Sequence, residues 1–291
     1  MTTKYSGSLL MCYGTTPYTP GKYLERAFRR IGVNVTLVED TIDFASVDMK
    51  QYCAVLFVES PARPPVTVIN RDQVNIPVMF WIHHGQNRLD FNLQLCEMYK
   101  PDLILMSHSL ELAPRFPAPV HFFPFGVDTT IFYSDKPFSQ RKHDVTFSGS
   151  LSSRYYQNRK ESLQLIEETF KDKAALSLRK KLFLQELGQH YGNSKIVFNQ
   201  TADELKTFNM RIFEGMGCGA LLLTDPTPEQ DRIFQDGVHY VVYQSKEDML
   251  EKLSYYISHP DQAEKIAKTG QQYVLQFHTY EHRAKEILNL I

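Results

Sequence analysis

Short apolar runs that alternate with helical patterns constrain the fold of this chain more than any other feature. In the first half the runs span residues 9–13, 33–38, 54–58, 78–82, 103–106 and 120–123. They are apolar and largely β-branched, which is typical of parallel strands covered on both faces. Between the first two runs, residues 22–31 place Leu24, Phe28 and Ile31 on one helical face before Gly32, a typical C-cap. This alternation predicts crossover units and an open α/β sheet.

The alternation of strand and helix patterns stops at residues 123–140. This segment contains Pro124, Gly126 and Pro137, and we interpret it as a domain linker. The alternation begins again with predicted strands at 144–148, 195–199, 220–224 and 238–243, and predicted helices near 156–170 and 210–217. Three helical stretches close the chain, the first opened by a capping-box variant, Ser245 with Asp248. The sequence therefore predicts two Rossmann-like lobes, residues 1–125 and 126–278, facing each other across a cleft. Residues 279–291 are predicted to form a helix that packs back on the N-terminal lobe.

Composition narrows the class of protein. The 291 residues carry a formal net charge of −1, which argues against a general polyanion binder. The four cysteines, Cys12, Cys53, Cys96 and Cys218, are widely spaced, so we expect neither a disulfide framework nor a zinc site. The apolar runs are too short for a signal peptide or a transmembrane segment. We therefore expect a cytoplasmic protein.

A cluster of cations follows the strand predicted at 144–148. After a Gly/Ser turn, Arg154, Arg159 and Lys160 crowd the start of a predicted helix. A helix N-terminus carries partial positive charge, so further cations there suit a strong anion such as a diphosphate. The alternative, three solvated surface cations, is equally compatible with this stretch alone.

A carboxylate lies in an apolar, glycine-rich setting at residues 209–225. Glu214 is surrounded by Phe213, Met216 and three glycines, of which Gly219 is the last before a strand. A buried carboxylate needs hydrogen-bond donors, and the hydroxyl groups of a ribose or a sugar are suitable. Tight helix–sheet packing with Glu214 reaching solvent is the alternative.

Three segments together resemble one enzyme group. The pattern Asn-x-Arg-x-Phe-Glu-x-x-x-Cys-Gly-Ala at 209–220 resembles the donor-binding segment of GT-B glycosyltransferases, closest to the CgeB-like (spore maturation protein) branch of the family-4-like enzymes. Residues 122–132 resemble the interdomain segment of these enzymes and residues 277–284 their closing helix. The resemblance covers most of residues 120–291, whereas the first 120 residues agree in layout only.

The resemblance implies roles for individual residues. Glu214 is similar to the acid that holds the donor ribose, and Arg154 or Lys160 to the cation that binds the diphosphate, with Arg211 as a further candidate. The expected donor-binding set is completed by three more residues, Asn209, Arg159 and Gly219. The chain departs from the family at Lys206, which stands where a second glutamate usually contacts the donor sugar. The identity of the sugar and the usual retention of configuration are therefore not carried over directly.

Two adjacent histidines end the run at 78–82. His83 and His84 follow it, and adjacent residues at a strand end point in opposite directions, so at most one is expected to reach the site. Enzymes similar to this chain place a His or Asp here. We favour His84 as the catalytic residue, because Gly85 lets the chain turn away. A histidine can supply a hydrogen bond or a proton near neutral pH. The alternative is a structural histidine bonded to backbone.

The loop after the first run resembles the acceptor-side loop of GT-B enzymes in position only. Its candidates are Gly14, Thr15, Thr16 and Lys22; the spacing does not match a P-loop. Most strand–helix turns with glycines bind nothing.

The sequence predicts a metal-independent glycosyltransferase without a cofactor. The chain contains no Asp-x-Asp, the paired carboxylates that usually hold a metal on a nucleotide-sugar. The donor is expected to be a UDP-sugar and the outcome retention. The acceptor is an unidentified glycan, protein or small molecule, with DNA a less favoured alternative. Rival interpretations are a sugar-nucleotide epimerase or hydrolase on the same fold, and a degenerate GT-B protein that serves as a binding or scaffold module.

Overall fold

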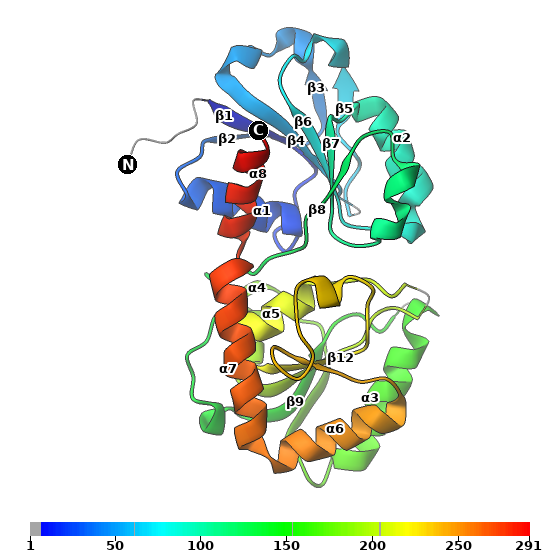
Figure 1. The fold of residues 1–291 in the computed structure, drawn as a ribbon, viewed down its shortest axis with the longest axis vertical. Coiled ribbons are helices and arrows are strands. Elements are labelled where there is room, and N and C mark those ends of the chain that lie inside the picture. The colour runs from blue at the N-terminus through cyan, green and yellow to red at the C-terminus, as the bar shows by residue number, and fades with distance from the viewer. Residues whose placement is uncertain (1–6, 61, 153, 204) are drawn as a thin grey trace. The chain divides into compact units, whose positions relative to one another are not determined.

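The computed structural model describes residues 7–60, 62–152, 154–203 and 205–291. The chain divides into two compact units (Figure 1). Unit 1 comprises Met1–Phe125 and Tyr280–Ile291, and unit 2 comprises Gly126–Thr279. The chain therefore leaves unit 1 once and returns to it for its last helix.

Unit 1 is built on a parallel sheet. In its described residues six strands pair in the order β2-β1-β4-β6-β7-β8. Their bounds are β1 Ser8–Cys12, β2 Val35–Val38, β4 Tyr52–Val58, β6 Val78–Ile82, β7 Leu103–Met106 and β8 Val120–Phe122. A small parallel pair, β3 (Thr41–Asp43) and β5 (Thr67–Ile69), lies apart from it. Because all ladders of the larger sheet are parallel, the carboxyl ends of its strands meet at one edge.

Helices cover both faces of this sheet. On one face α2 (Leu89–Tyr99) packs Leu95, Cys96 and Tyr99 against the strands, in a core that also contains Phe57 and Phe80. Tyr99 stacks on Phe57 with ring centroids 3.9 Å apart. On the other side α1 (Pro20–Arg30) and the last helix, α8 (Tyr280–Leu290), lie side by side (Figure 1). Both faces of the strands are therefore buried, which explains their continuous apolar sequences.

Buried and half-buried ionic groups attach α8 to unit 1. Arg30 and Glu281 form an ion pair at 2.5 Å, and His121 and Glu286 lie 2.7 Å apart. The buried guanidinium of Arg283 donates to the carbonyl oxygen of Pro124 at 2.8 Å. These contacts join the end of the chain to β8 and to the segment that leaves unit 1.

Unit 2 contains a second parallel sheet with strand order β10-β9-β11-β12-β13 in its described part. The strands are β9 His143–Ser148, β10 Leu176–Lys180, β11 Ser194–Asn199, β12 Leu221–Thr224 and β13 Val241–Val242. The helices are α3 Gln157–Phe170, α4 Leu184–Gly192, α5 Met210–Gly217, α6 Lys246–Ser258 and α7 Pro260–Phe277. Helices α3 and α6 pack on one face, where Ile166 and Met249 join Phe147 and Phe198 in the core. Helices α4, α5 and α7 pack together on the other side (Figure 1).

The predicted α/β architecture with parallel sheets is confirmed, with differences in detail. The prediction of Ser245 as N-cap is confirmed, because its Oγ accepts the N–H of Asp248 at 3.1 Å, and Gly32 adopts φ 84° as expected of a helix C-cap. Helices α2 and α4 and strands β3, β5 and β10 were not predicted. Cys53 is half-buried, unlike Cys12 and Cys96, and all four cysteines are free. Among the described residues, no helix is long and apolar enough to span a membrane.

Candidate functional site

Arg211 joins two strand ends at the carboxyl edge of unit 2. It lies in the first turn of α5, directly after the loop that follows β11. Its Nε donates to the carbonyl oxygen of Ser148 at 3.0 Å, and its Nη1 donates to Oδ1 of Asn199 at 2.5 Å. Ser148 ends β9 and Asn199 ends β11, so Arg211 places a positive charge at the centre of this edge. A side chain at Gly149 would collide with this guanidinium, which explains the glycine in the turn.

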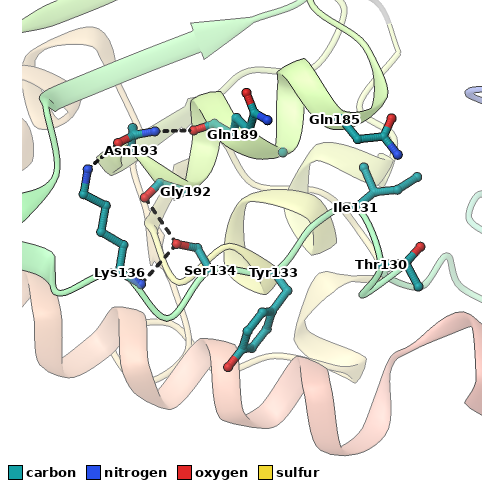
Figure 2. Close-up of a pocket in the computed structure, with 10 residues that line it drawn as sticks. Thr130, Ile131, Tyr133, Ser134, Lys136, Gln185, Gln189, Gly192 and Asn193 are labelled. Carbon is teal, nitrogen blue, oxygen red and sulfur yellow. Dashed lines mark hydrogen bonds between the residues drawn. The ribbon is translucent and has the colours of Figure 1, made fainter.

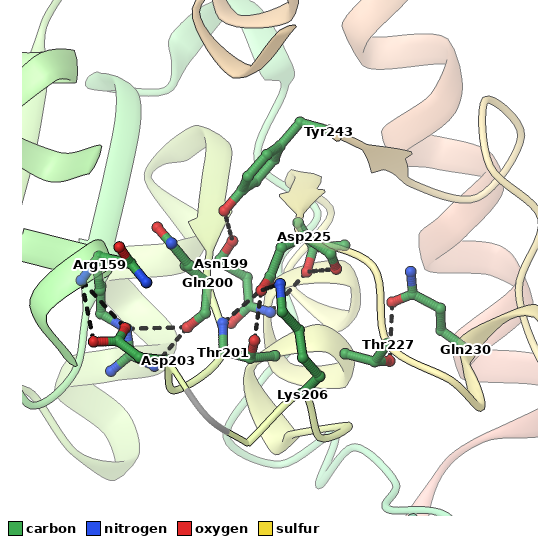
Figure 3. Close-up of polar contacts among 12 residues, drawn as sticks. Arg159, Asn199, Gln200, Thr201, Asp203, Lys206, Asp225, Thr227, Gln230 and Tyr243 are labelled. Carbon is green, nitrogen blue, oxygen red and sulfur yellow. Dashed lines mark hydrogen bonds and ion pairs between the residues drawn. The ribbon is translucent and has the colours of Figure 1, made fainter. Parts of the chain in front are cut away.

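Arg159 lies close to Arg211 but is engaged with the main chain. It is 5% exposed, and its three guanidinium nitrogens donate to the carbonyl oxygens of Ser150 and Gln200 at 2.5–3.1 Å. Figure 3 shows Arg159 beside Gln200. Burial, and then the charge of Arg211, lowers the pKa of Arg159 from 12.5 to about 10. Both guanidiniums lie over the ring of Phe147. Arg159 therefore holds together the loops after β9 and β11.

The start of α3 already holds a carboxylate of the protein. The N–H groups of Gln157 and Asn158 donate to the carboxylate of Asp203 at 2.7 and 3.2 Å. The helix end that the sequence assigned to a diphosphate is thus occupied by an anion from the loop after β11. Arg154, in a short 3-10 turn before α3, lies over the ring of Tyr155 at 5.0 Å. Lys160 makes no hydrogen bond or ion pair with any residue that the structure describes.

Glu214 is buried without an internal hydrogen bond. The residue is 6% exposed, no described residue donates to its carboxylate, and its oxygens still reach solvent. Burial raises its pKa from 4.5 to about 7, against the opposing charge of Arg211. At the N-cap of α5, the side chain of Asn209 makes no capping hydrogen bond, and its buried Oδ1 lacks a partner among the described residues. Unlike the start of α3, this helix start is not capped by its N-cap side chain, and it carries a cation, Arg211.

Asp225 is a buried carboxylate that sequence reasoning missed. It follows β12, is 4% exposed, and accepts the N–H and the hydroxyl of Thr201 at 3.0 and 2.5 Å (Figure 3). Lys206, at the position where the family usually has an acid, lies with Nζ 3.6 Å from Asp225 Oδ2 and is largely exposed. Asp225 therefore partly balances the positive charge that Lys206 introduces. An acid directly after a buried strand was the available signal.

The structure does not place Gly219 beside Arg211 and Asp225. It precedes β12 and so lies at the amino edge of the sheet, opposite the strand ends that carry Arg211 and Asp225. Its φ of 70° and its closeness to Arg141 and Gln271 explain the glycine. Gly219 thus serves the turn between α5 and β12.

In unit 1 the two histidines at the end of β6 point in different directions, as predicted. His83 is 5% exposed, and its ring meets Trp81 edge-on with centroids 4.2 Å apart. Burial lowers its pKa to about 3, so it is neutral at physiological pH. The side chain of His84 is 37% exposed. His83 is therefore part of the core, and His84 is the histidine that solvent or a ligand can reach.

Glu59, at the end of β4, holds both histidines, and sequence reasoning missed it. Its Oε2 accepts the N–H groups of His83 and His84 at 2.7 and 2.8 Å. Its other oxygen lies 3.0 Å from Nε of Arg88. Like Asp225, it is an acid directly after a buried strand.

The next strand end adds a third histidine. His108 follows β7, and its Nε2 is 2.6 Å from the carbonyl oxygen of His83. Burial lowers its pKa to about 4, so the ring is neutral and its Nε2–H donates to that carbonyl. Ser109 adopts φ 61° and packs so tightly on Gly85 that a Cβ there would collide with its side chain. The turn after His84 is thus fixed by close packing.

The acceptor-side loop after β1 is engaged with the protein itself. Thr15 donates through N–H and hydroxyl to Glu39 at 3.1 and 2.6 Å. The carbonyl oxygen of Gly14 accepts from Ser60, and that of Thr16 accepts from Thr19. Lys22 forms an ion pair with Glu25 at 2.8 Å. The loop is ordered by these contacts, and none of them indicates a ligand.

A cavity of about 330 Å³ lies elsewhere in unit 2, between α4 and the segment that enters this unit. Figure 2 shows Gln185 and Gln189 on α4, Asn193 just after its end, and Tyr133 and Lys136 across from them. Lys136 donates to Asn193 Oδ1 at 2.5 Å. This cavity contains none of the predicted site residues. No three His, Cys, Asp or Glu side chains in the described ranges form a group that could hold a metal ion.

Comparison with known proteins identifies the family. Residues 139–289 match the family model described as glycosyl transferase-like. No curated protein sequence matches.

Solved structures of low sequence identity share the fold. Sucrose-phosphate synthase from Thermosynechococcus elongatus is 10% identical, with 98% of each chain covered and a TM-score of 0.65. HepE from Anabaena, in complex with UDP and glucose, is 10% identical over 98% of this chain and 99% of that chain, with a TM-score of 0.64. An alpha-glucosyltransferase in complex with UDP-glucose and DNA containing an abasic site is 11% identical over 97% and 98%, with a TM-score of 0.64. These structures have the GT-B fold that the sequence predicted.

The family match covers just over half of the chain and includes the strand ends that carry Arg211, Glu214 and Asp225. The protein therefore belongs to the glycosyl transferase-like family and is an enzyme of the glycosyltransferase class.

Proposed function

We propose that this enzyme transfers a sugar from a nucleotide-diphosphate donor, expected to be a UDP-sugar, to an acceptor hydroxyl group. The observation that carries the proposal is Glu214, a residue only 6% exposed whose carboxylate has no donor among the described residues and still reaches solvent. The hydroxyl groups of a ribose would supply the missing hydrogen bonds. Two similar structures were solved with UDP or UDP-glucose bound, which supports a uridine donor.

The diphosphate is expected at the start of α5. A helix N-terminus attracts anions, and here Arg211 adds a cation while the Asn209 side chain makes no capping hydrogen bond. The start of α3 is a weaker candidate because Asp203 occupies it. Positive charge at this place would stabilise the departing diphosphate. Lys160 and Arg154 are proposed as further cations for the donor.

We further propose that the reaction is metal-independent and retains configuration. The chain contains no Asp-x-Asp, so Arg211 and the neighbouring cations would neutralise the leaving group instead of a metal. Retention follows the family resemblance, and the chain departs from that family at Lys206, which lies 3.6 Å from Asp225. His84 in unit 1 is proposed as the residue that contacts a sugar hydroxyl.

The test is thermal stabilisation by UDP, GDP, CDP, ADP and dTDP, with and without EDTA. A nucleotide present at 100 times its dissociation constant should stabilise the native state by about 2.7 kcal/mol. We expect one nucleotide, UDP first, to stabilise the wild type and not Glu214→Ala. The matched control is Glu251→Ala, an exposed glutamate on α6, which should respond like the wild type. If no nucleotide stabilises the wild type, the proposal is wrong.

A further inference from the structure

The carboxylate of Glu59 contacts His84 in two ways. Its Oε2 accepts the N–H of His84 at 2.8 Å, and the same oxygen lies 3.3 Å from Nδ1 of the His84 ring. The side chain of Glu59 is fully buried, so water does not compete for these oxygens. One carboxylate therefore accepts a hydrogen bond from the backbone of His84 and faces its ring, where the 3.3 Å contact is electrostatic and Nδ1 makes no hydrogen bond.

The charge state of Glu59 determines what the ring can do. Burial alone would raise the pKa of Glu59, but the contacts with His84 and His83 outweigh it and the pKa is lowered. Glu59 is therefore ionised, and an ionised carboxylate can only accept hydrogen bonds. The negative charge 3.3 Å from Nδ1 of His84 favours a proton on that nitrogen, which leaves Nε2 of the neutral ring with a lone pair.

The exposure of the His84 ring also indicates that Nε2 is the accessible ring nitrogen. Nδ1 of His84 is buried, although the side chain as a whole is 37% exposed. The opposite edge, which includes Nε2, is thus the accessible one. Asn92 Nδ2 donates to the carbonyl oxygen of His84 at 2.9 Å, and Gly85 packs against Ser109. Both contacts limit movement of the residue.

We propose that Glu59 is a positioning residue that fixes His84 in the Nδ1–H tautomer and so presents Nε2 as a hydrogen-bond acceptor for a sugar hydroxyl. The contact with a sugar rests on the proposed function, whereas the tautomer does not. Arg88, with Nε 3.0 Å from the other oxygen of Glu59, keeps that carboxylate turned toward the histidines.

The first test needs no ligand. In the full chain labelled with 15N-histidine, at a pH where His84 is neutral, NMR spectroscopy distinguishes a protonated from an unprotonated ring nitrogen. The His84 signals are assigned by their loss in His84→Gln. We expect Nδ1 to be protonated and Nε2 to be unprotonated. A wild-type ring protonated at Nε2 overturns the proposal.

A variant then tests whether Glu59 is the cause. Glu59→Gln keeps the size of the side chain and an oxygen that can accept the two backbone N–H groups, but it removes the negative charge beside Nδ1, so the single tautomer of His84 should become a mixture. The matched control is Glu286→Gln, which alters the other His–Glu contact of unit 1, His121 with Glu286 at 2.7 Å. It should change the signals of His121 and leave those of His84 unaltered. Unchanged His84 signals in folded Glu59→Gln would contradict the proposal.

Measurements of turnover distinguish a failure of this inference from a failure of the proposed function. With UDP-glucose as the first donor probe, release of UDP is expected to be about tenfold slower in Glu59→Gln than in Glu286→Gln. His84→Gln can place an acceptor near the position of Nε2 and should retain more activity than His84→Asn, which can do so only near Nδ1. If the tautomer is as expected but all three site variants turn over like the wild type, the role of His84 in transfer is wrong and the tautomer assignment stands.

Discussion

Arg159 and Lys160 are adjacent in the sequence, but they differ in burial and in hydrogen bonding. The guanidinium of Arg159 is buried and donates to two main-chain carbonyl groups, whereas Lys160 has no partner among the described residues. Arg159→Met should lower the free energy of unfolding by about 2–4 kcal/mol, because those carbonyls lose a charged donor. Lys160→Met should change it by less than about 0.5 kcal/mol and weaken donor binding. Urea denaturation and nucleotide titration of both variants check this, and equal losses of stability would contradict it.

Glu214 makes unit 2 sensitive to pH. Its pKa is about 7 in the folded chain and near 4.5 when unfolded, so between these values the folded state holds a proton that the unfolded state releases. Stability should therefore fall as the pH rises from 4.5 to 7, by about 3 kcal/mol for this group. Glu214→Gln should remove that part of the pH dependence. Denaturation of both proteins at pH 4.5 and 8 gives the difference, and parallel curves would refute the prediction.

At the scale of single residues, the sequence predicted roles for Arg211, Glu214 and His84, and these roles stay predictions. It missed Glu59 and Asp225, because a single acid after a strand does not reveal that loops from elsewhere will donate to it. Asp203 shows the same limit: its capping of α3 joins positions 46 residues apart. Such partners are set by tertiary packing and are absent from local patterns.

At the scale of elements, α4 depends on a glycine that faces the chain entering unit 2. A Cβ at Gly188 would collide with the carbonyl oxygen of Ile131. Gly188→Ala would normally favour a helix, yet here overpacking should destabilise unit 2 by about 1–3 kcal/mol. Gln189→Ala, on an exposed neighbour, is the control and should be nearly neutral. Chemical denaturation compares the two, and a stabilised Gly188→Ala would show that the helix can move.

The elements that sequence reasoning found and missed differ in burial. Central strands such as β4, β6 and β7 are apolar throughout and were predicted closely. β10 is an edge strand that ends in exposed Arg179 and Lys180, so it lacks an apolar run. In α4, Gly188 and Gly192 interrupt the helical pattern although both are buried. An element at a sheet edge, or one that packs closely through glycines, therefore lacks the local sequence pattern by which a strand or helix is predicted.

At the scale of the whole molecule, the two units should respond differently to acid. In unit 1 His83 and His108 have pKa values of about 3 and 4 because they are buried, whereas unfolded histidines bind protons below about 6.5. Unit 1 should therefore lose stability as the pH falls from 6.5 toward 4. In unit 2 Glu214 acts in the opposite direction, and His190, with a pKa of about 4, offsets it in part.

We therefore expect unit 1 to open before unit 2 at pH 5. Hydrogen exchange with mass spectrometry, at pH 5 and pH 7.5 and corrected for intrinsic rates, would compare peptides from β4 and β6 with peptides from β11 and β12. Protection should fall more in the first group. A larger loss of protection in the second group would show that the histidines do not control acid stability.

The chain has a single tryptophan, and it lies in the core of unit 1. Trp81 donates from Nε1 to Ser107 at 2.9 Å and meets His83 edge-on. Its fluorescence is therefore an intrinsic optical label for one half of the molecule, placed beside a ring whose protonation would quench it. Emission that changes while the far-ultraviolet signal of the helices in unit 2 persists would follow one unit alone, without any attached dye.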